Sequence, residues 1–106
     1  MIETGIYVGL NDRDTKEQKL ETERYVNILK SVCRNYEAAF SFSVQQGGYM
    51  HEDGTYTQEN SLVLSLIDAD KNLIDEIAKD LCVFFHQESV MITKEYVRAY
   101  FVREEL

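Results

Sequence analysis

The stretch from residue 38 to residue 68 constrains the fold more than any other part of this sequence. It contains two runs of alternating apolar and polar residues, which meet at Asp53-Gly54. Such alternation is typical of strands with one buried face, and Asp-Gly between two alternating runs is a strong signal for a β-hairpin. We therefore expect the rest of the chain to be organised around an antiparallel strand pair.

The register of this hairpin follows from where its large apolar residues must go. A two-residue turn at Asp53-Gly54 would place Phe42 opposite Ser65, with the leucines of the second run on the other face. One extra residue in the first run would pair Phe42 with Leu64 instead, so that the apolar residues share one face. Gly47-Gly48 could hold that residue, because glycine accepts the positive φ that a bulge requires. We therefore expect a β-bulge there.

Four further segments flank the hairpin. Residues 2–10 alternate and indicate a strand. Residues 20–36 and 73–85 carry apolar side chains at helical spacing and indicate two amphipathic helices. Residues 96–103 alternate again and indicate a last strand, which gives two helices and four strands in all.

The order of these elements, β-α-β-β-α-β, predicts an α+β fold of the ferredoxin-like type. Right-handed crossovers would place both helices on one face of an antiparallel sheet with strand order 4-1-3-2. Asp14, followed by Glu17, and Asp70 are the expected N-caps of the two helices. The whole chain, residues 1–106, is predicted to form one domain.

The charge balance restricts the class of partner. The formal net charge is −8, from 19 acidic and 11 basic residues, which opposes binding to a phosphate backbone and predicts no nucleic-acid partner. The apolar runs are too short to span a membrane, and no basic segment followed by an apolar one opens the sequence, so we expect a cytoplasmic protein, or else a mature chain whose signal was removed. Cys33 and Cys82 are interpreted as buried free thiols.

The sheet face that the two helices leave open is the first candidate for function. Its expected members combine aromatic, aliphatic and basic side chains: Tyr7, Ile67, Tyr96, Arg98 and Tyr100. A mixed surface of this kind is typical of protein contacts, although antiparallel sheets also leave such faces in water. Our leading interpretation is therefore a non-catalytic binding module, acting as a homodimer or as an adaptor or inhibitor of another protein.

A cleft beside the hairpin is the alternative. Gln87 and Glu88 follow the second helix, while Tyr49 and Gln58 flank the hairpin turn, and together they could line a ligand site near residues 47–56 and 87–89. Local hydrogen bonding in loops would also account for these polar residues. The alternative is thus a small-molecule-binding or catalytic domain. No sequence signature of a catalytic residue, a metal ligand or a cofactor site is present, so none is assigned.

Two short segments resemble a known family. Residues 3–10 read Glu-Thr-Gly-Ile-Tyr-Val-Gly-Leu, and residues 85–90 read Phe-His-Gln-Glu-Ser-Val after an apolar helix. Both resemble small uncharacterised bacterial proteins that open with a Glu-Thr-x-x-Tyr-x-Gly strand and carry a Gln-Glu-Ser-Val segment near the end. The resemblance implies a compact α+β domain and no particular activity. A secretion signal associated with many members is not seen in this sequence.

Overall fold

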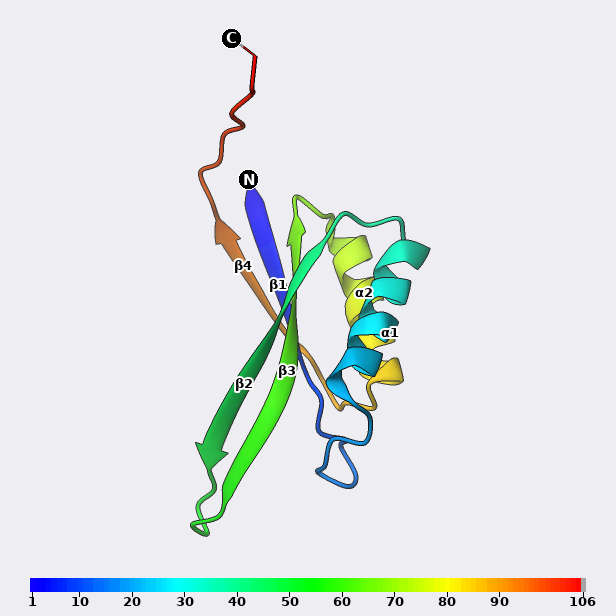
Figure 1. Cartoon of the computed structure of the whole chain (residues 1–106), viewed down its shortest axis with the longest axis vertical. Coiled ribbons are helices and arrows are strands. Elements are labelled where there is room, and N and C mark those ends of the chain that lie inside the picture. Colours follow the sequence, from blue (N-terminus) through cyan, green and yellow to red (C-terminus); the bar gives the residue numbers. More distant parts are fainter. Residues whose placement is uncertain (106) are drawn as a thin grey trace.

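The computed structural model describes residues 1–105. Its elements are β1 (Ile2–Gly9), α1 (Thr22–Asn35), β2 (Ser41–Met50), β3 (Tyr56–Ile67), α2 (Lys71–Phe84) and β4 (Met91–Tyr96). The strands form one antiparallel sheet in the order β2-β3-β1-β4, and both helices lie on the same side of it (Figure 1). The predicted ferredoxin-like βαββαβ fold and its strand order are confirmed.

The core lies between the two helices and the central strands β1 and β3. Ile6 and Val8 on β1 and Leu62 and Leu64 on β3 are fully buried, and they occupy alternate positions of the two strands. From the other side, α1 and α2 present their apolar stripes, in which Leu29, Ile77 and Leu81 are also fully buried. Burial of these side chains from water is the main force that holds the helices on the sheet.

The hairpin has the predicted pairing but no bulge. Phe42 lies opposite Leu64 and Val44 opposite Leu62, as expected. The ladder is unbroken from the Ser41–Ser65 pair to the Met50–Tyr56 pair, with Gly47 and Gly48 regularly paired. The predicted β-bulge at Gly47-Gly48 is therefore wrong.

The extra residue that sets this register lies in the turn. The His51 N–H donates to Thr55 O at 2.8 Å, which leaves three residues at the tip instead of two. Gly54 adopts φ of 88°, the left-handed conformation that a three-residue hairpin turn needs at its last position. Asp53 Oδ1 accepts the Thr55 N–H at 2.9 Å and fixes the turn.

The hairpin extends beyond the layer of helices (Figure 1). Val44 lies on the edge strand β2 and remains 47% exposed, although its partner Leu62 on the central strand β3 is fully buried. Phe42 is half-buried, and Phe40 lies just before β2 and is 36% exposed. The apolar residues of the hairpin, which were expected to share one buried face, therefore differ in how far they are buried.

Strand β4 begins and ends earlier in the chain than predicted. It pairs with β1 from Met91 to Tyr96, and pairing ends where Val97 N–H donates to Met1 O at 2.9 Å. The prediction of a strand over residues 96–103 was wrong, because alternation does not decide which segment finds a partner strand. Residues 98–103 extend away from the sheet (Figure 1).

This shift changes three of the five residues assigned to the open face. Tyr96 pairs with Ile2, which shares a face with the buried Thr4 and Ile6, so Tyr96 lies on the helix side of the sheet. Arg98 and Tyr100 lie beyond the sheet altogether.

The other two residues lie on the open face as predicted. Tyr7 pairs with Val63, and Ile67 is 48% exposed at the end of β3.

The two helices begin differently. Asp70 Oδ1 accepts the Leu73 N–H at 2.8 Å, which confirms Asp70 as the N-cap of α2. Helix α1 begins only at Thr22, and its N-cap residue Glu21 makes no side-chain capping bond. Asp14 is therefore not an N-cap, because residues 12–20 form a separate loop before the helix.

Both cysteines are free thiols, Cys33 buried and Cys82 half-buried. Of the helices in residues 1–105, neither has the length and apolar character needed to cross a membrane.

Candidate functional site

A cleft of about 410 Å³ lies beside the far half of the hairpin. Three segments form it: the hairpin itself, the chain that follows β1, and the connection from α2 to β4. Its lining is mainly polar and consists of Asn11, Asp12, Arg13, Lys16, Tyr49, His51, Thr57, Glu59, Gln87, Glu88 and Ser89. The volume is in the range of sites that bind small molecules.

The structure brings together three of the four residues predicted to line a cleft. Tyr49, Gln87 and Glu88 all contribute to it. Gln58 does not, because its neighbours Thr57 and Glu59 face the cleft and adjacent strand residues point to opposite sides. Gln58 instead lines a separate hollow of about 350 Å³ with Gly48.

Sequence reasoning missed the contribution of the chain after β1. Asn11, Asp12 and Arg13 line the cleft, yet in sequence they looked only like a turn. One available signal was their position, a run of polar residues directly after a buried strand. Residues in such positions are often placed at the edge of a sheet, where sites form.

Glu59 has a defined position in the cleft. Its Oε2 atom accepts the Asn11 N–H at 3.0 Å, and the side chain is half-buried. The carboxylate rests on Gly9, where an added Cβ atom would lie 2.5 Å from Glu59 Oε2. The absence of a side chain at position 9 therefore leaves the space that this carboxylate occupies.

His86 leaves α2 in an unusual backbone conformation. Its φ is 52°, in the left-handed region that favours glycine, and the Gln87 N–H donates back to Cys82 O at 2.9 Å. This is the pattern of a Schellman helix end, with histidine in the place where glycine is usual. The turn directs the imidazole toward Asp12 and sends Gln87 and Glu88 to the cleft.

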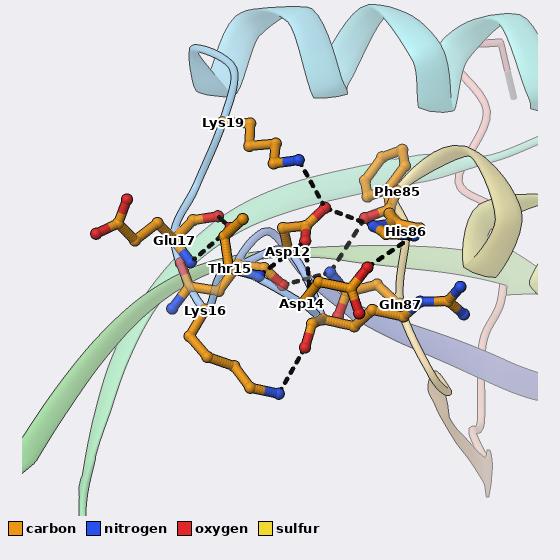
Figure 2. A network of polar contacts seen from close by, with 11 residues as sticks. Asp12, Asp14, Thr15, Lys16, Glu17, Lys19, Phe85, His86 and Gln87 are labelled. Atoms are coloured by element: carbon orange, nitrogen blue, oxygen red, sulfur yellow. Dashed lines mark hydrogen bonds and ion pairs between the residues drawn. The ribbon is translucent and has the colours of Figure 1, made fainter.

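Asp12 is the centre of a polar network that joins the loop after β1 to the end of α2 (Figure 2). It is 4% exposed, and its Oδ2 atom accepts from His86 Nδ1 at 2.6 Å. Oδ1 accepts the backbone N–H groups of Asp14 and Thr15 at 2.9 and 3.1 Å. Lys19 Nζ lies 3.6 Å from Oδ2.

These contacts hold the pKa of Asp12 well below its usual range. The hydrogen bond from His86 has the largest effect, the backbone N–H groups of Thr15 and Asp14 add to it, and burial acts in the opposite direction. Asp12 is therefore a carboxylate at neutral pH, and the network keeps its negative charge beside the cleft.

Asp12, Asp14 and His86 also have the composition of a metal site, since one ligand atom from each lies within 4.8 Å of the others. Their contacts in the structure are with one another and with Lys19. His86 Nδ1 donates to Asp12 Oδ2, His86 Nε2 lies 3.5 Å from Asp14 Oδ2, and the Lys19 ammonium beside Asp12 repels a cation. These contacts orient the three side chains.

Amide side chains fasten the hairpin to the rest of the molecule. Asn60 Nδ2 donates to Gln18 Oε1 at 2.9 Å, and Gln18 Nε2 donates to Thr22 Oγ1 at the start of α1 at 3.0 Å. Gln87 Nε2 donates to Asn11 O at 2.7 Å. The bond between Gln87 and Asn11 joins two of the three segments that form the cleft.

The hairpin wall presents an aromatic surface. The rings of Tyr49 and His51 meet edge to face with centroids 4.8 Å apart, and His51 Nε2 lies 2.7 Å from Thr57 Oγ1. Tyr49 is 52% exposed. A ring held in this way can stack on a planar ligand.

A family model described as a protein of unknown function (DUF3574) matches residues 3–101. The chain belongs to this family. The match confirms the resemblance seen in the first strand and in the segment after α2, and it covers nearly the whole chain. No curated protein sequence matches significantly.

Solved structures with the same architecture include a phage SAM lyase. Its apo form has a TM-score of 0.68 and 25% identity, over 89% of this chain and 78% of that chain. The same lyase in complex with S-methyl-5′-thioadenosine has a TM-score of 0.65 and 26% identity, over 89% and 79% of the two chains. The periplasmic divalent cation tolerance protein CutA from Archaeoglobus fulgidus has a TM-score of 0.56 at 11% identity, over 93% and 87%. The CutA likeness concerns the fold alone.

Proposed function

We propose that the cleft binds a small adenosine-containing cation of the SAM (S-adenosylmethionine) type. The observation that carries this proposal is a cleft with three carboxylates and an exposed aromatic ring, in a chain 25–26% identical to a SAM lyase of the same fold. This supports the interpretation of the cleft as a small-molecule site over that of a turn with local hydrogen bonds.

The charges of the cleft suit the charges of such a ligand. SAM carries a sulfonium and an ammonium group, both positive, and a carboxylate. The lining contains three carboxylates, those of Asp12, Glu59 and Glu88, and two basic side chains, those of Arg13 and Lys16. Asp12 already contacts His86 and Lys19, which leaves the two glutamates for the ligand. Carboxylates favour a sulfonium over a neutral thioether of the same shape, so the cleft should discriminate by charge.

The aromatic wall suits the other end of the ligand. Adenine is planar, and stacking on an aromatic ring stabilises a bound base by about 1–3 kcal/mol. Tyr49 is exposed on the cleft and is supported from the side by His51. We assign the adenine to Tyr49 and the sulfonium end to the two glutamates.

Titration calorimetry with SAM and with S-adenosylhomocysteine tests the charge argument, because the second ligand lacks the methyl group and the sulfonium charge and keeps the ammonium and carboxylate groups. We expect SAM to bind about tenfold more tightly, or about 1.4 kcal/mol. Glu59→Gln and Glu88→Gln should each weaken SAM binding by about fivefold and leave the other ligand nearly unaffected. Glu23→Gln removes the same charge from the exposed side of α1 and is the control.

Equal affinity for the two ligands, or no binding of either, would contradict the proposal.

A pair of glycine substitutions tests the position of the Glu59 carboxylate without changing any charge. An alanine at Gly9 would push the carboxylate away from the Asn11 N–H, so Gly9→Ala should weaken SAM binding about as much as Glu59→Gln. Gly47 has nothing within 4 Å of an added Cβ atom, so Gly47→Ala is the matched control. If both variants bind as the parent does, the Glu59 carboxylate does not contact the ligand.

The same samples report on catalysis. Release of S-methyl-5′-thioadenosine from SAM, followed by chromatography, would extend the proposal from binding to turnover. Loss of that release in Glu88→Gln, with circular dichroism unchanged, would place Glu88 in the catalytic machinery.

A second candidate function is the binding module acting through the open sheet face, as a homodimer or as an adaptor or inhibitor of another protein. The observation that favours it is the face itself, where Ile67 is 48% exposed and Tyr7, on the side opposite to the buried Ile6 and Val8, is half-buried. If the face is an interface between copies, Tyr7→Glu should dissociate the assembly in size-exclusion chromatography with light scattering. A monomeric parent chain would leave only another protein as its partner.

A further inference from the structure

Residues 98–103 have the sequence of a strand but no strand beside them. They read Arg-Ala-Tyr-Phe-Val-Arg, and Tyr100, Phe101 and Val102 are 87%, 84% and 84% exposed. Within residues 1–105 this segment donates or accepts no hydrogen bond, the last one to β1 being made by Val97. Aromatic and β-branched residues favour strands, so this segment has strand propensity without a partner.

Strand β2 has the complementary property, a free edge without a partner segment. It is the outermost strand on its side of the sheet, so its outer N–H and C=O groups face solvent. Its sequence, SFSVQQGGYM, contains no charged residue and no proline, the usual devices that prevent edge pairing. The opposite edge strand, β4, carries Lys94 and Glu95 and is protected by them.

Charge also favours contact between these two segments. Residues 98–103 begin and end with an arginine and contain no acidic residue, and Glu104 and Glu105 follow them. Strand β2 is preceded by Glu37 and followed by Glu52 and Asp53. Arg98 and Arg103 of one copy are therefore attracted to the acidic residues that flank the edge strand of another, while the neutral middle of each segment can pair without desolvating a charge.

We propose that residues 98–103 of one copy add as a strand to the edge of β2 in a second copy of this chain. Backbone hydrogen bonds supply the pairing, and Tyr100, Phe101 and Val102 become covered in the process, as in other cases of strand addition. The contact joins two different surfaces, so it forms a reciprocal dimer or a ring where the rotation between copies closes, and an open chain of copies where it does not. It differs from an interface on the open sheet face and does not depend on what the cleft binds.

Size-exclusion chromatography with light scattering on the full chain, over a range of concentrations, is the test. Tyr100→Pro removes a backbone donor, and Ser43→Lys places a charge on the edge of β2; each should raise the dissociation constant at least about tenfold, or about 1.4 kcal/mol. Tyr100→Phe and Thr93→Lys are the matched controls and should leave it unchanged. Ser43 and Thr93 are both exposed small hydroxyl residues, one on each edge strand.

Backbone amide exchange provides a second readout, which is measured on the parent chain and does not require the variants to be soluble. In the parent chain the outward N–H groups of β2 should become protected as concentration rises, together with those of residues 98–103. A monomer at every concentration overturns the proposal. The proposal is also overturned if only one of Tyr100→Pro and Ser43→Lys weakens the assembly. The same holds if neither substitution weakens it and Tyr7→Glu dissociates it.

Discussion

Leu62 and Val44 are cross-strand neighbours on the same face of one hairpin, yet the first is fully buried and the second is 47% exposed. The difference is due to the position of the two strands, because β3 lies between β2 and β1, whereas β2 is the edge strand. Further along, the hairpin arm extends past the helices (Figure 1). The helix-covered part of the sheet provides the stability of the fold. The uncovered arm provides one wall of the cleft and a free edge, and it adds little to the core.

The largest effect is expected from a pair of alanine substitutions that tests this comparison. Leu62→Ala should lower the free energy of unfolding by about 2–5 kcal/mol, because it opens a cavity in the core. Val44→Ala should change it by less than about 1 kcal/mol, since the side chain already contacts water. Urea denaturation at equilibrium measures both values. Equal losses would mean that the arm is packed against something in solution, for which a second copy would be the first candidate.

A pH series tests the Asp12 network, which joins the loop after β1 to the end of α2. Because the pKa of Asp12 is lowered in the folded state, its contribution to stability is complete above its ordinary pKa of about 3.9. That contribution is lost as pH falls from there through the lower folded-state value. Asp12→Asn should therefore have a lower urea midpoint than the parent at pH 7, and the gap should narrow below about pH 4.

The control for this series is Asp14→Asn, which changes a residue whose side chain is 71% exposed. It should shift the midpoint much less at pH 7. A gap between Asp12→Asn and the parent that stays constant with pH would contradict the assigned cause of the pKa shift.

The smallest effect is expected from substitutions at the starts of the two helices. Asp70→Ala removes the capping bond to the Leu73 N–H and should destabilise the fold by about 1 kcal/mol. Glu21→Ala, at the same position of α1, removes no capping bond and should change stability by less than about 0.5 kcal/mol. Thermal unfolding followed by circular dichroism can rank the two variants. The reverse ranking would show that α1 is held at its start by its side chain.

Much of the fold could be predicted from the sequence because the spacing of apolar residues within each segment indicates a helix or a strand. The helical spacing of α1 and α2 and the alternation of β1 to β3 each reflect one buried face, and their order left few topologies. The last strand was misplaced because residues 96–103 alternate more clearly than Met91–Tyr96, and only pairing with β1 decides between them. The bulge at Gly47-Gly48 was wrong because the turn, and not the strand, contains the extra residue.

The candidate site was only half predictable, for a different reason. Tyr49, Gln87 and Glu88 stand out in sequence as polar or aromatic residues beside element ends. Asn11 and Asp12 do not, since their roles arise from contacts with Glu59 and His86, about 48 and 74 positions away in the chain. Gln58 was assigned to the cleft one residue away from Glu59, and a shift of one residue reverses the face of a strand.

The hydrogen bonds at the base of the hairpin have a mechanical consequence. A two-stranded ribbon twists more freely than a broad sheet, and here the ribbon is restrained near its base by Asn11, Gln18 and Asn60. The mouth of the cleft can then widen or narrow by torsion of the ribbon about these anchors, with no loop folding over it. Ligand access would then depend on the torsional stiffness of the hairpin, which Asn60→Ala would lower without changing a residue that lines the cleft.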